Sequence, residues 1–400
     1  MRESIPEQGR LDCTSVGNLP LNLNCRDELI PIIAALKHLY SDRARCSQIM
    51  KLIESDVNGT ASKNHGRRGI GHWQILVLAA VRLGCDFDYD HLHNLAEEHL
   101  TLRRIMGIGD WEEVRFSRTQ IRDNLCKLSA STVESISHVV VDAGHEIVPE
   151  AIKRQRADST VVETNIHYPT ESSLIFDGVR KIIELCVRLH EEYDITGWRQ
   201  HAHLVKQVKK SNRNIARIVA RKGGGYKERL KSEYSTLLNR AGTVIQRAKE
   251  TCEIMESDFE LPLQTIGLLA SIRNFISLTL QVCNTATRRV LNDENVPNKD
   301  KLFSIFEPHT QLYRRGKAGV PNQYGRLVLF FEDGAGFITH HHVMPRDAQD
   351  VDVATEQTMA LQKRMDGQVE AVSFDRGFHS PANQAELPNI VPNVCLPMPG

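Results

Sequence analysis

The order of the periodic segments after residue 150 limits the fold of this chain more than any other feature. The β-branched run "RQRADSTVVETNIHYP" predicts a strand with Asp158 near its middle. "GRLVLFFED" and "GFITHHHVM" predict a hairpin that turns at Asp333-Gly334, where a type I′ turn requires positive φ. "VEAVSF" predicts a strand that leads to Asp375, and "NIVPNVCLP" predicts a last strand. Because helical segments separate these strands, we expect an α/β fold with a mixed sheet flanked by helices.

Helical periodicity dominates the rest of the chain and predicts its domain organisation. Residues 1–25 are expected to be a loose lead-in, and residues 26–150 an all-α N-terminal domain. Residues 151–400 would then form the sheet-containing domain, with a helical insertion at 172–290.

Composition narrows the class of protein without identifying a partner. Lys and Arg together number 50, as do Asp and Glu, so the net charge is neutral. The nine cysteines occur singly with no CxxC pair, which argues against a zinc ribbon or a disulfide framework. No N-terminal signal segment precedes them, and no apolar run approaches 18 residues. We expect a soluble cytoplasmic protein that does not enter a membrane.

Asp158 and Asp375 are the candidate catalytic residues, because each lies in or at the end of a predicted strand. Sites in open α/β sheets gather at strand ends, and two carboxylates there can share Mg²⁺ through oxygen ligands. Gly377, two residues after Asp375, allows close approach of the backbone. The alternative is that these aspartates only cap the following turn or helix.

The residues around both aspartates resemble the catalytic blocks of a known family. "RADSTVVETNIHYPTESSLIFDGVRKI" resembles the first block of bacterial insertion-sequence transposases of the DDE type, and "VSFDRGFHSP" resembles the second. "EPHTQLYRRGKAGVPNQYG" is similar to the middle region of that family, and "GRRGIGHWQILVLAAVRLGCDFDYDHLHNLAEEHLTLRRIMG" to its helical DNA-binding domain. The resemblance covers nearly the whole chain.

The resemblance implies an RNase H-like catalytic domain in which Asp158 and Asp375 hold Mg²⁺ or Mn²⁺. It implies cleavage at insertion-sequence ends followed by strand transfer, on double-stranded terminal-repeat and target DNA. The family's third acid is a helical Glu well downstream of the second Asp. Glu386, eleven residues after Asp375, is too early for that role. We therefore expect the third acid beyond Gly400, and a homodimer on DNA in the bacterial cytoplasm, associated with the nucleoid.

A basic segment between Arg199 and Lys249 is the strongest charge asymmetry in the chain. It contains 14 Lys and Arg residues against Glu228 and Glu233, a local net charge of +12. Neutralisation of phosphates by such side chains drives DNA binding, although a solvated helix face is the alternative. Candidate DNA-binding residues here and elsewhere are Arg67, Arg68, Arg118, Arg180, Lys181, Arg199, His201, Lys206, Lys209, Lys210, Arg213, Arg217, Arg221 and Lys222.

Several of these candidates have a plain alternative. Arg67 and Arg68 could lie in a solvated loop, and Arg180 and Lys181 could simply pair with Glu184. The segment "WRQHAH", Trp198 to His203, is expected to face DNA rather than bind a metal.

A triple histidine, His340 to His342, raises the question of a metal site. Successive strand residues point to opposite faces, so only His340 and His342 could share one. An ordinary surface strand is the favoured interpretation.

Two other functions remain open from the sequence. One is a nuclease of the same fold that lacks strand transfer, since both activities use the same site. The other is a truncated remnant that binds DNA without cleaving it, because the third acid is not among these 400 residues.

Overall fold

The structure, a computed structural model, has both helices and a sheet, which confirms the mixed α/β class. It describes residues 2, 4–5, 13–58, 69–257, 261–314 and 321–398. The chain divides into two compact units, and strands β1, β3 and β4 contribute residues to both. The first unit comprises Met1–Ala157, Phe331–His340 and Ala354–Gly400, and the second comprises Asp158–Phe330 and His341–Val353. The domain boundaries expected from the sequence stay predictions.

The described residues before the first strand form helices. They are α1 (Leu29–Ser41), α2 (Arg43–Asn58), α3 (His72–Gly84), α4 (Tyr89–Glu98), α5 (Leu100–Ile105), α6 (Arg118–Leu125) and α7 (Ala130–Ile147), with short 3₁₀ turns at Val16–Asn18 and Pro149–Lys153. Trp73 is central to their core. Its ring packs edge-on against Tyr40 with the centroids 5.2 Å apart, and its Nε1–H donates to the Ile105 carbonyl at 2.7 Å. The buried indole therefore keeps its hydrogen bond inside the apolar core.

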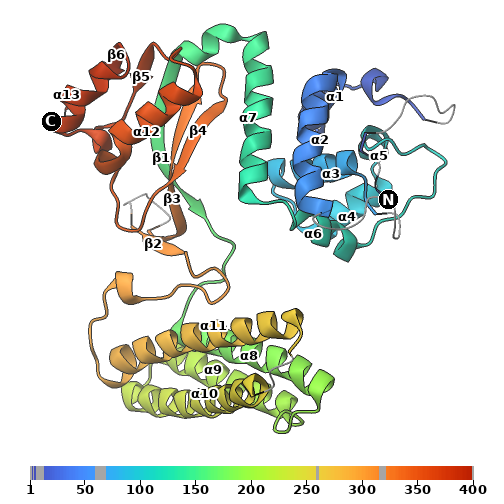
Figure 1. Ribbon diagram of the computed structural model, residues 1–400. Coiled ribbons are helices and arrows are strands. Elements are labelled where there is room, and N and C mark those ends of the chain that lie inside the picture. Colours follow the sequence, from blue (N-terminus) through green and yellow to red (C-terminus); the bar gives the residue numbers. More distant parts are fainter. Residues whose placement is uncertain are drawn as a thin grey trace. The chain divides into compact units, whose positions relative to one another are not determined.

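Six strands form one mixed sheet in the order β2-β3-β1-β5-β6, with β4 paired to β3. Their bounds are β1 (Arg154–Glu163), β2 (Gln311–Tyr313), β3 (Gln323–Asp333), β4 (Ile338–Val343), β5 (Ala371–Ser373) and β6 (Asn393–Cys395). β1 and β5 are parallel, as are β5 and β6, whereas β2 and β3 are antiparallel. Helices α12 (Asp350–Arg364) and α13 (Pro381–Glu386) lie beside β5 and β6 in Figure 1. The predicted strands and both of these helices are thus present.

Strand β1 buries alternate residues, as expected for a strand with one face on a core. Gln155, Ala157 and Ser159 are buried, whereas Arg156 and Asp158 between them are exposed. The β-branched residues that follow continue the extended conformation to Glu163. The alternation therefore puts Asp158 on the exposed face of β1.

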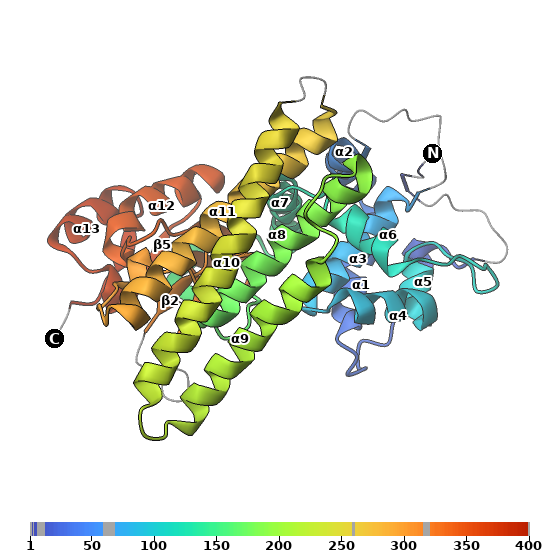
Figure 2. The same cartoon turned by 90° about the horizontal axis from the view of Figure 1, so that it is seen from below.

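Four long helices make up most of the second unit and run side by side in Figures 1 and 2. They are α8 (Glu171–Tyr193), α9 (His201–Arg221), α10 (Tyr226–Glu256) and α11 (Leu263–Ala286). One apolar cluster fills the space between them. Gly178 lets α8 approach α11 closely, because a Cβ at that position would lie 2.1 Å from Thr279 Oγ1. Trp198, fully buried, donates a hydrogen bond to Thr251 Oγ1 at 3.0 Å.

The β3–β4 hairpin is present, but the type I′ turn predicted at Asp333-Gly334 is wrong. The positive φ, 87°, belongs to Gly336. The Gly336 N–H donates to the Asp333 carbonyl at 3.1 Å, and the Asp333 N–H donates to the Phe337 carbonyl at 3.0 Å. The Asp333 carboxylate also accepts from the N–H groups of Ala335 and Phe337. A side chain that bonds the backbone ahead of it favours this longer turn.

Leu263–Leu291 has the length and mean hydropathy, 1.4, of a membrane-spanning helix. The buried side of this stretch belongs to the apolar cluster that α11 shares with α8 and α10. Only 28% of its apolar window is buried, and a single stretch of this kind is weak evidence for a membrane span.

Candidate catalytic carboxylates and nucleic-acid interface

Asp158 is on the exposed face of β1, two residues after Arg156. Within the described part of the chain its carboxylate has no hydrogen bond or ion pair, and the residue as a whole is exposed. A carboxylate in this state needs no rearrangement of the protein to accept a cation. Asp158 therefore has the accessibility that a metal ligand requires.

Asp375 follows β5 by two residues and is also exposed. Its side chain caps the 3₁₀ turn Arg376–Phe378, because Oδ1 accepts from the Gly377 N–H at 2.8 Å. The capping role considered for this residue is therefore real. It occupies one oxygen only, and a carboxylate with two oxygens can cap a turn and still bind a cation.

The register of β1 and β5 relates the two aspartates to one paired position. In these parallel strands Arg156 is the partner of Ser373. Asp158 and Asp375 each come two residues after that pair. Since successive side chains in a strand alternate between faces, Asp158 is on the same face of β1 as Arg156, whereas Asp375 follows the end of β5 and caps the next turn. Sequence reasoning could not supply this register, because the two segments are more than 200 residues apart.

Glu332 is an acidic residue near this surface that the sequence did not single out. Its carboxylate, at the end of β3, lies 3.0 Å from Nη2 of Arg156. Both side chains are substantially exposed, at 38% for Glu332 and 67% for Arg156. Alternation along β1 thus puts this ion-paired arginine on the same face as Asp158. The alternation of β1 marks Arg156 as exposed, but nothing local identifies Glu332 as its partner.

In the part of the chain that the structure describes, no three His, Cys, Asp or Glu side chains are grouped to hold a metal ion. The donor chemistry of Asp158 and Asp375 nevertheless suits Mg²⁺. This ion prefers oxygen ligands, keeps several of its waters and is often held by one or two carboxylates. Neither oxygen of Asp158 has a hydrogen bond within the described residues, and Asp375 has Oδ2 outside its cap.

Helix α9 carries its basic residues on one side. At about 100° per residue, six basic side chains share an arc of roughly 120°: Lys206, Lys209, Lys210, Arg213, Arg217 and Arg221. We call these six the α9 basic face. All six are exposed, whereas Val208, Ser211 and Ile215 are buried on the opposite side. No ion pair involves any of the six among the residues that the structure describes. Lys222, just after the helix, is also exposed.

Other basic residues of the segment are held by the protein itself. Arg240 donates to the Gln207 carbonyl and to Ser211 Oγ, and Arg247 donates to the Gly197 carbonyl. Lys231 pairs with Asp293, which lies outside the basic segment. Among the described residues, Lys227, Arg229 and Lys249 of α10 are exposed and have no ion pair, so α9 carries the largest group of free basic side chains and α10 adds three more.

The expectation that Trp198 faces DNA is wrong, because its indole is in the core of the four-helix unit. The neighbouring Arg199 is exposed, and His201 lies at the start of α9, where Nδ1 is 3.1 Å from the Trp198 carbonyl. These two residues remain candidates at the edge of the basic segment. The sequence around Trp198 does not indicate that this residue is buried, because it is followed by basic residues and histidines.

Arg180 and Lys181 differ in their surroundings on α8. Lys181 Nζ pairs with Glu184 at 2.7 Å, as the alternative interpretation expected, whereas Arg180 lies 4.0 Å from Asp177. Burial raises the pKa of Asp177, and the charges of His167 and Arg180 act in the opposite direction. Arg180 thus partly neutralises a carboxylate of its own helix.

The remaining candidates lie outside α8 and α9. Arg118 begins α6, where Ser117 provides the cap, and it pairs with Asp90 at 2.9 Å on an exposed surface. Arg67 and Arg68 lie outside the described residues. His340, in β4, bonds through Nε2 to Gln357 at 2.9 Å. That contact fits the interpretation of His340 to His342 as part of an ordinary strand.

Comparisons of the chain with models of protein families, with curated proteins and with solved structures found no match.

Proposed function

We propose that this protein is a DNA-cleaving and strand-transferring enzyme of the DDE transposase type. Asp158 and Asp375 would hold Mg²⁺ or Mn²⁺ as two of the three acids of such a site, and the α9 basic face would bind the DNA. The observation that carries the proposal is the parallel register of β1 and β5. Both exposed aspartates come two residues after one paired position, Arg156 and Ser373.

The roles of the two carboxylates follow from their exposure. A phosphodiester is bulky and charged, so residues that act on it need an open surface rather than a closed pocket. Asp158 offers both oxygens, while Asp375 offers Oδ2 and is oriented by its bond to Gly377. A bound divalent cation there supplies Lewis-acid activation of water or of a 3′-hydroxyl. No nucleophile from the protein itself is required.

The α9 basic face supports DNA as the substrate. From Lys206 to Arg221 it extends about 22 Å at 1.5 Å per residue, long enough to follow several phosphates of one strand. Its six charges have no acidic partners among the described residues, so they are available to replace the counterions of DNA. An enzyme that acts on double-stranded DNA needs a surface that binds DNA of any sequence, in addition to its catalytic residues.

The proposal is tested with the full chain and a plasmid that carries the DNA flanking its gene. Metal-dependent cleavage and strand transfer are measured for the wild type, Asp158→Asn and Asp375→Asn. Each substitution should abolish both activities and leave DNA binding unchanged, because it removes a charge that only the metal uses. Asp347→Asn is the control, since Asp347 is exposed and has a left-handed φ of 68° that Asn tolerates.

Cleavage that survives in either Asp158→Asn or Asp375→Asn would contradict the assignment of that carboxylate. Cleavage without strand transfer would instead identify a nuclease. DNA binding without any cleavage by the wild type, across Mg²⁺ and Mn²⁺, would make the chain a DNA-binding protein.

A further inference from the structure

The second unit contains a pocket lined by residues other than those proposed for catalysis. It has a volume of about 340 Å³, near the lower end of the range for small-molecule sites. Its walls come from the beginning of α8, the end of α11 with the turn after it, the segment 298–303 and the strands β2 and β3. Residues far apart in the sequence thus meet there, and none of the candidates discussed above lines it.

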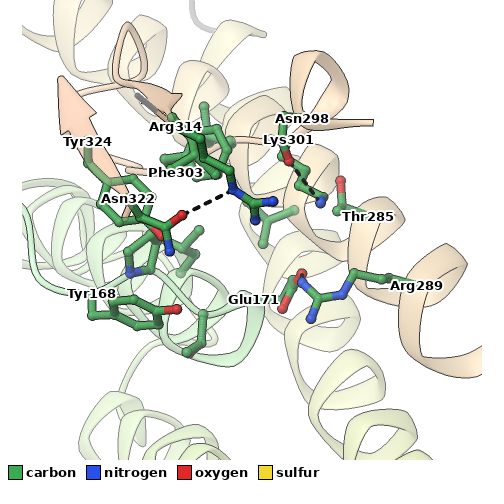
Figure 3. Close-up of a pocket in the computed structure, with 16 residues that line it drawn as sticks. Tyr168, Glu171, Thr285, Arg289, Asn298, Lys301, Phe303, Arg314, Asn322 and Tyr324 are labelled. Carbon is green, nitrogen blue, oxygen red and sulfur yellow. Dashed lines mark hydrogen bonds and ion pairs between the residues drawn. The ribbon is translucent and has the colours of Figure 1, made fainter. Parts of the chain in front are cut away.

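Three cationic side chains converge on this pocket: Arg289, Lys301 and Arg314 (Figure 3). The only carboxylate among the lining residues is Glu171, which pairs with Arg289 and has 12% of its side chain exposed. Lys301 Nζ donates to the amide oxygen of Asn298 at 3.2 Å, and Arg314 Nε donates to that of Asn322 at 3.1 Å. Neutral amides hold two of the cations, so the pocket keeps an excess of two positive charges.

No further carboxylate among the lining residues balances this positive charge, so the cations repel one another. Burial lowers the pKa of Lys301, and the nearby charges of Arg289 and Arg314 lower it further, against the opposing effect of Glu171. Like charges that are held together without counterions disfavour the charged form of each. An anion bound between them would remove that repulsion. Arg289 lies on a π-helical turn, Thr287–Leu291, a rare conformation that is frequent at functional sites.

Aromatic rings form another part of the pocket wall. Tyr324 packs edge-on against Tyr168, with the centroids 6.0 Å apart, and lies 5.6 Å from the ring of Phe303. Phe303 is buried, whereas Tyr168 is 69% exposed and so has ring surface to offer. Aromatic rings beside cations are the combination that binds nucleotides, because bases stack on rings and phosphates bond to Lys and Arg.

We propose that this pocket binds a nucleotide, with its phosphate at Lys301, Arg314 and Arg289 and its base against Tyr168 and Tyr324. The ligand is either a free mononucleotide or the 5′-phosphorylated end of a DNA strand, which share this chemistry. The inference does not depend on the carboxylates of the proposed catalytic site. It assigns a second nucleic-acid-related site to the chain.

The test is isothermal titration calorimetry of the full chain in a buffer with chelator and no divalent metal. The ligands are dAMP, deoxyadenosine, inorganic phosphate and a short 5′-phosphorylated deoxyadenosine oligonucleotide. The variants are Lys301→Gln and Tyr168→Ala. Lys299→Gln is the matched control, because Lys299 is exposed and two residues from Lys301 but does not line the pocket.

In the wild type, dAMP should bind more tightly than deoxyadenosine or phosphate. Lys301→Gln should weaken dAMP about tenfold, the loss expected for one charged hydrogen bond. Tyr168→Ala should weaken it roughly fivefold or more through lost stacking. Lys299→Gln should leave it unchanged. Thermal unfolding of each variant shows whether the fold is intact.

Binding of the 5′-phosphorylated oligonucleotide, compared with that of dAMP, shows whether the ligand is a DNA strand end or a free nucleotide. Tighter binding than dAMP, with the same loss in Lys301→Gln, identifies a DNA strand end. If only dAMP responds to Lys301→Gln, the ligand is a free nucleotide. Binding of dAMP that neither substitution changes, phosphate that binds as tightly as dAMP, or no binding of dAMP and the oligonucleotide would each overturn the proposal. Because no metal is present, failure of the proposed catalysis would not alter these results.

Discussion

His145 in α7 and Asp333 at the end of β3 form a buried pair, with Nε2 of the imidazole 2.6 Å from Oδ2 of the carboxylate. Only 7% of the His145 side chain and none of the Asp333 side chain is exposed. The other oxygen of Asp333 accepts from the backbone N–H groups of Ala335 and Phe337. The Phe337 ring packs edge-on against the imidazole. One carboxylate thus joins a helix to the β3–β4 turn within the first unit.

Replacing Asp333 by Ala should therefore destabilise the first unit strongly. The substitution leaves the buried imidazole without its partner and removes the acceptor of two backbone N–H groups in the turn. Breaking a buried, hydrogen-bonded pair costs about 3–5 kcal/mol in free energy of unfolding. We expect the midpoint of urea unfolding, followed by circular dichroism, to fall markedly.

The matched control for Asp333→Ala is Asp90→Ala. Asp90 pairs with Arg118 at 2.9 Å, but 71% of its side chain is exposed. Solvent screens such a pair, so its loss should change the free energy of unfolding by no more than about 1 kcal/mol. Equal effects of the two substitutions would show that the buried pair is not a stabilising link.

Gly178 should resist replacement even by alanine. An alanine inside a helix is normally favoured over glycine by about 0.5–1 kcal/mol. Here the added Cβ would lie 2.1 Å from Thr279 Oγ1, so α8 and α11 would have to move apart. Overpacking of this kind typically costs about 1–3 kcal/mol. We expect Gly178→Ala to lower the thermal unfolding midpoint.

Gly267→Ala, on the neighbouring helix α11, should have the opposite effect on the unfolding midpoint. Gly267 is inside α11, and a Cβ there would meet nothing within 4 Å. Only the gain in helix stability remains, so this substitution should raise the unfolding midpoint slightly. A decrease in both variants would mean that packing at Gly178 is not the cause.

Local sequence patterns predicted the main helices and strands correctly. In these segments the spacing of buried residues and the conformational preference of the residues indicate the same element. The β-branched run of β1 and the apolar hairpin strands have few alternatives, and the helices α8 to α11 follow from their periodicity. Strand β2, Gln311–Tyr313, was not predicted. It has three residues, too few for alternation to be visible, and is extended because β3 pairs with it.

The site was predicted less completely, because its geometry depends on distant residues. Asp158 and Asp375 could be selected from their strands, but their common relation to Arg156 and Ser373 comes from long-range pairing. Trp198 was misjudged because its neighbours in sequence are polar and its neighbours in space are not. The pocket around Lys301 was not visible at all, since its walls come from separate segments.

Seven of the nine cysteines should divide into two classes by reactivity. Burial raises the pKa of the Cys46, Cys186 and Cys252 thiols, and it raises the pKa of Cys283 to about 12. The thiolate is the reactive form, so these four should be inert near neutral pH. The exposed cysteines are Cys25, Cys126 and Cys395.

We therefore expect rapid labelling of the three exposed cysteines by a thiol reagent at about pH 8, below the ordinary thiol pKa near 8.5. The buried Cys46, Cys186 and Cys252, and the half-buried Cys283 with its raised pKa, should react only after unfolding. Peptide mass spectrometry at successive times assigns each site. Rapid labelling of Cys186 in the folded protein would show that the core between α8 and α10 opens readily.

Neutralising part of the α9 basic face should weaken DNA binding and its dependence on salt together. The variant Lys209→Gln/Arg213→Gln/Arg217→Gln removes three exposed charges from the middle of the face and leaves the buried side of α9 untouched. Each lost phosphate contact should reduce the slope of log K against log salt by about 0.9, or roughly 2–3 for the variant. Fluorescence anisotropy with a labelled duplex at several salt concentrations measures both quantities.

A control with the same change in charge separates a specific surface from net charge alone. Lys51, Lys299 and Lys363 are exposed and lie on α2, the segment 298–300 and α12. If α9 is the DNA-binding surface, Lys51→Gln/Lys299→Gln/Lys363→Gln should leave the salt slope nearly unchanged, since net charge acts only at long range and is screened beyond about 10 Å at 0.1 M salt. Equal losses in the two triple variants would mean that DNA responds to the overall charge of the protein. In that case the alignment of basic residues on α9 would reflect only their exclusion from the core.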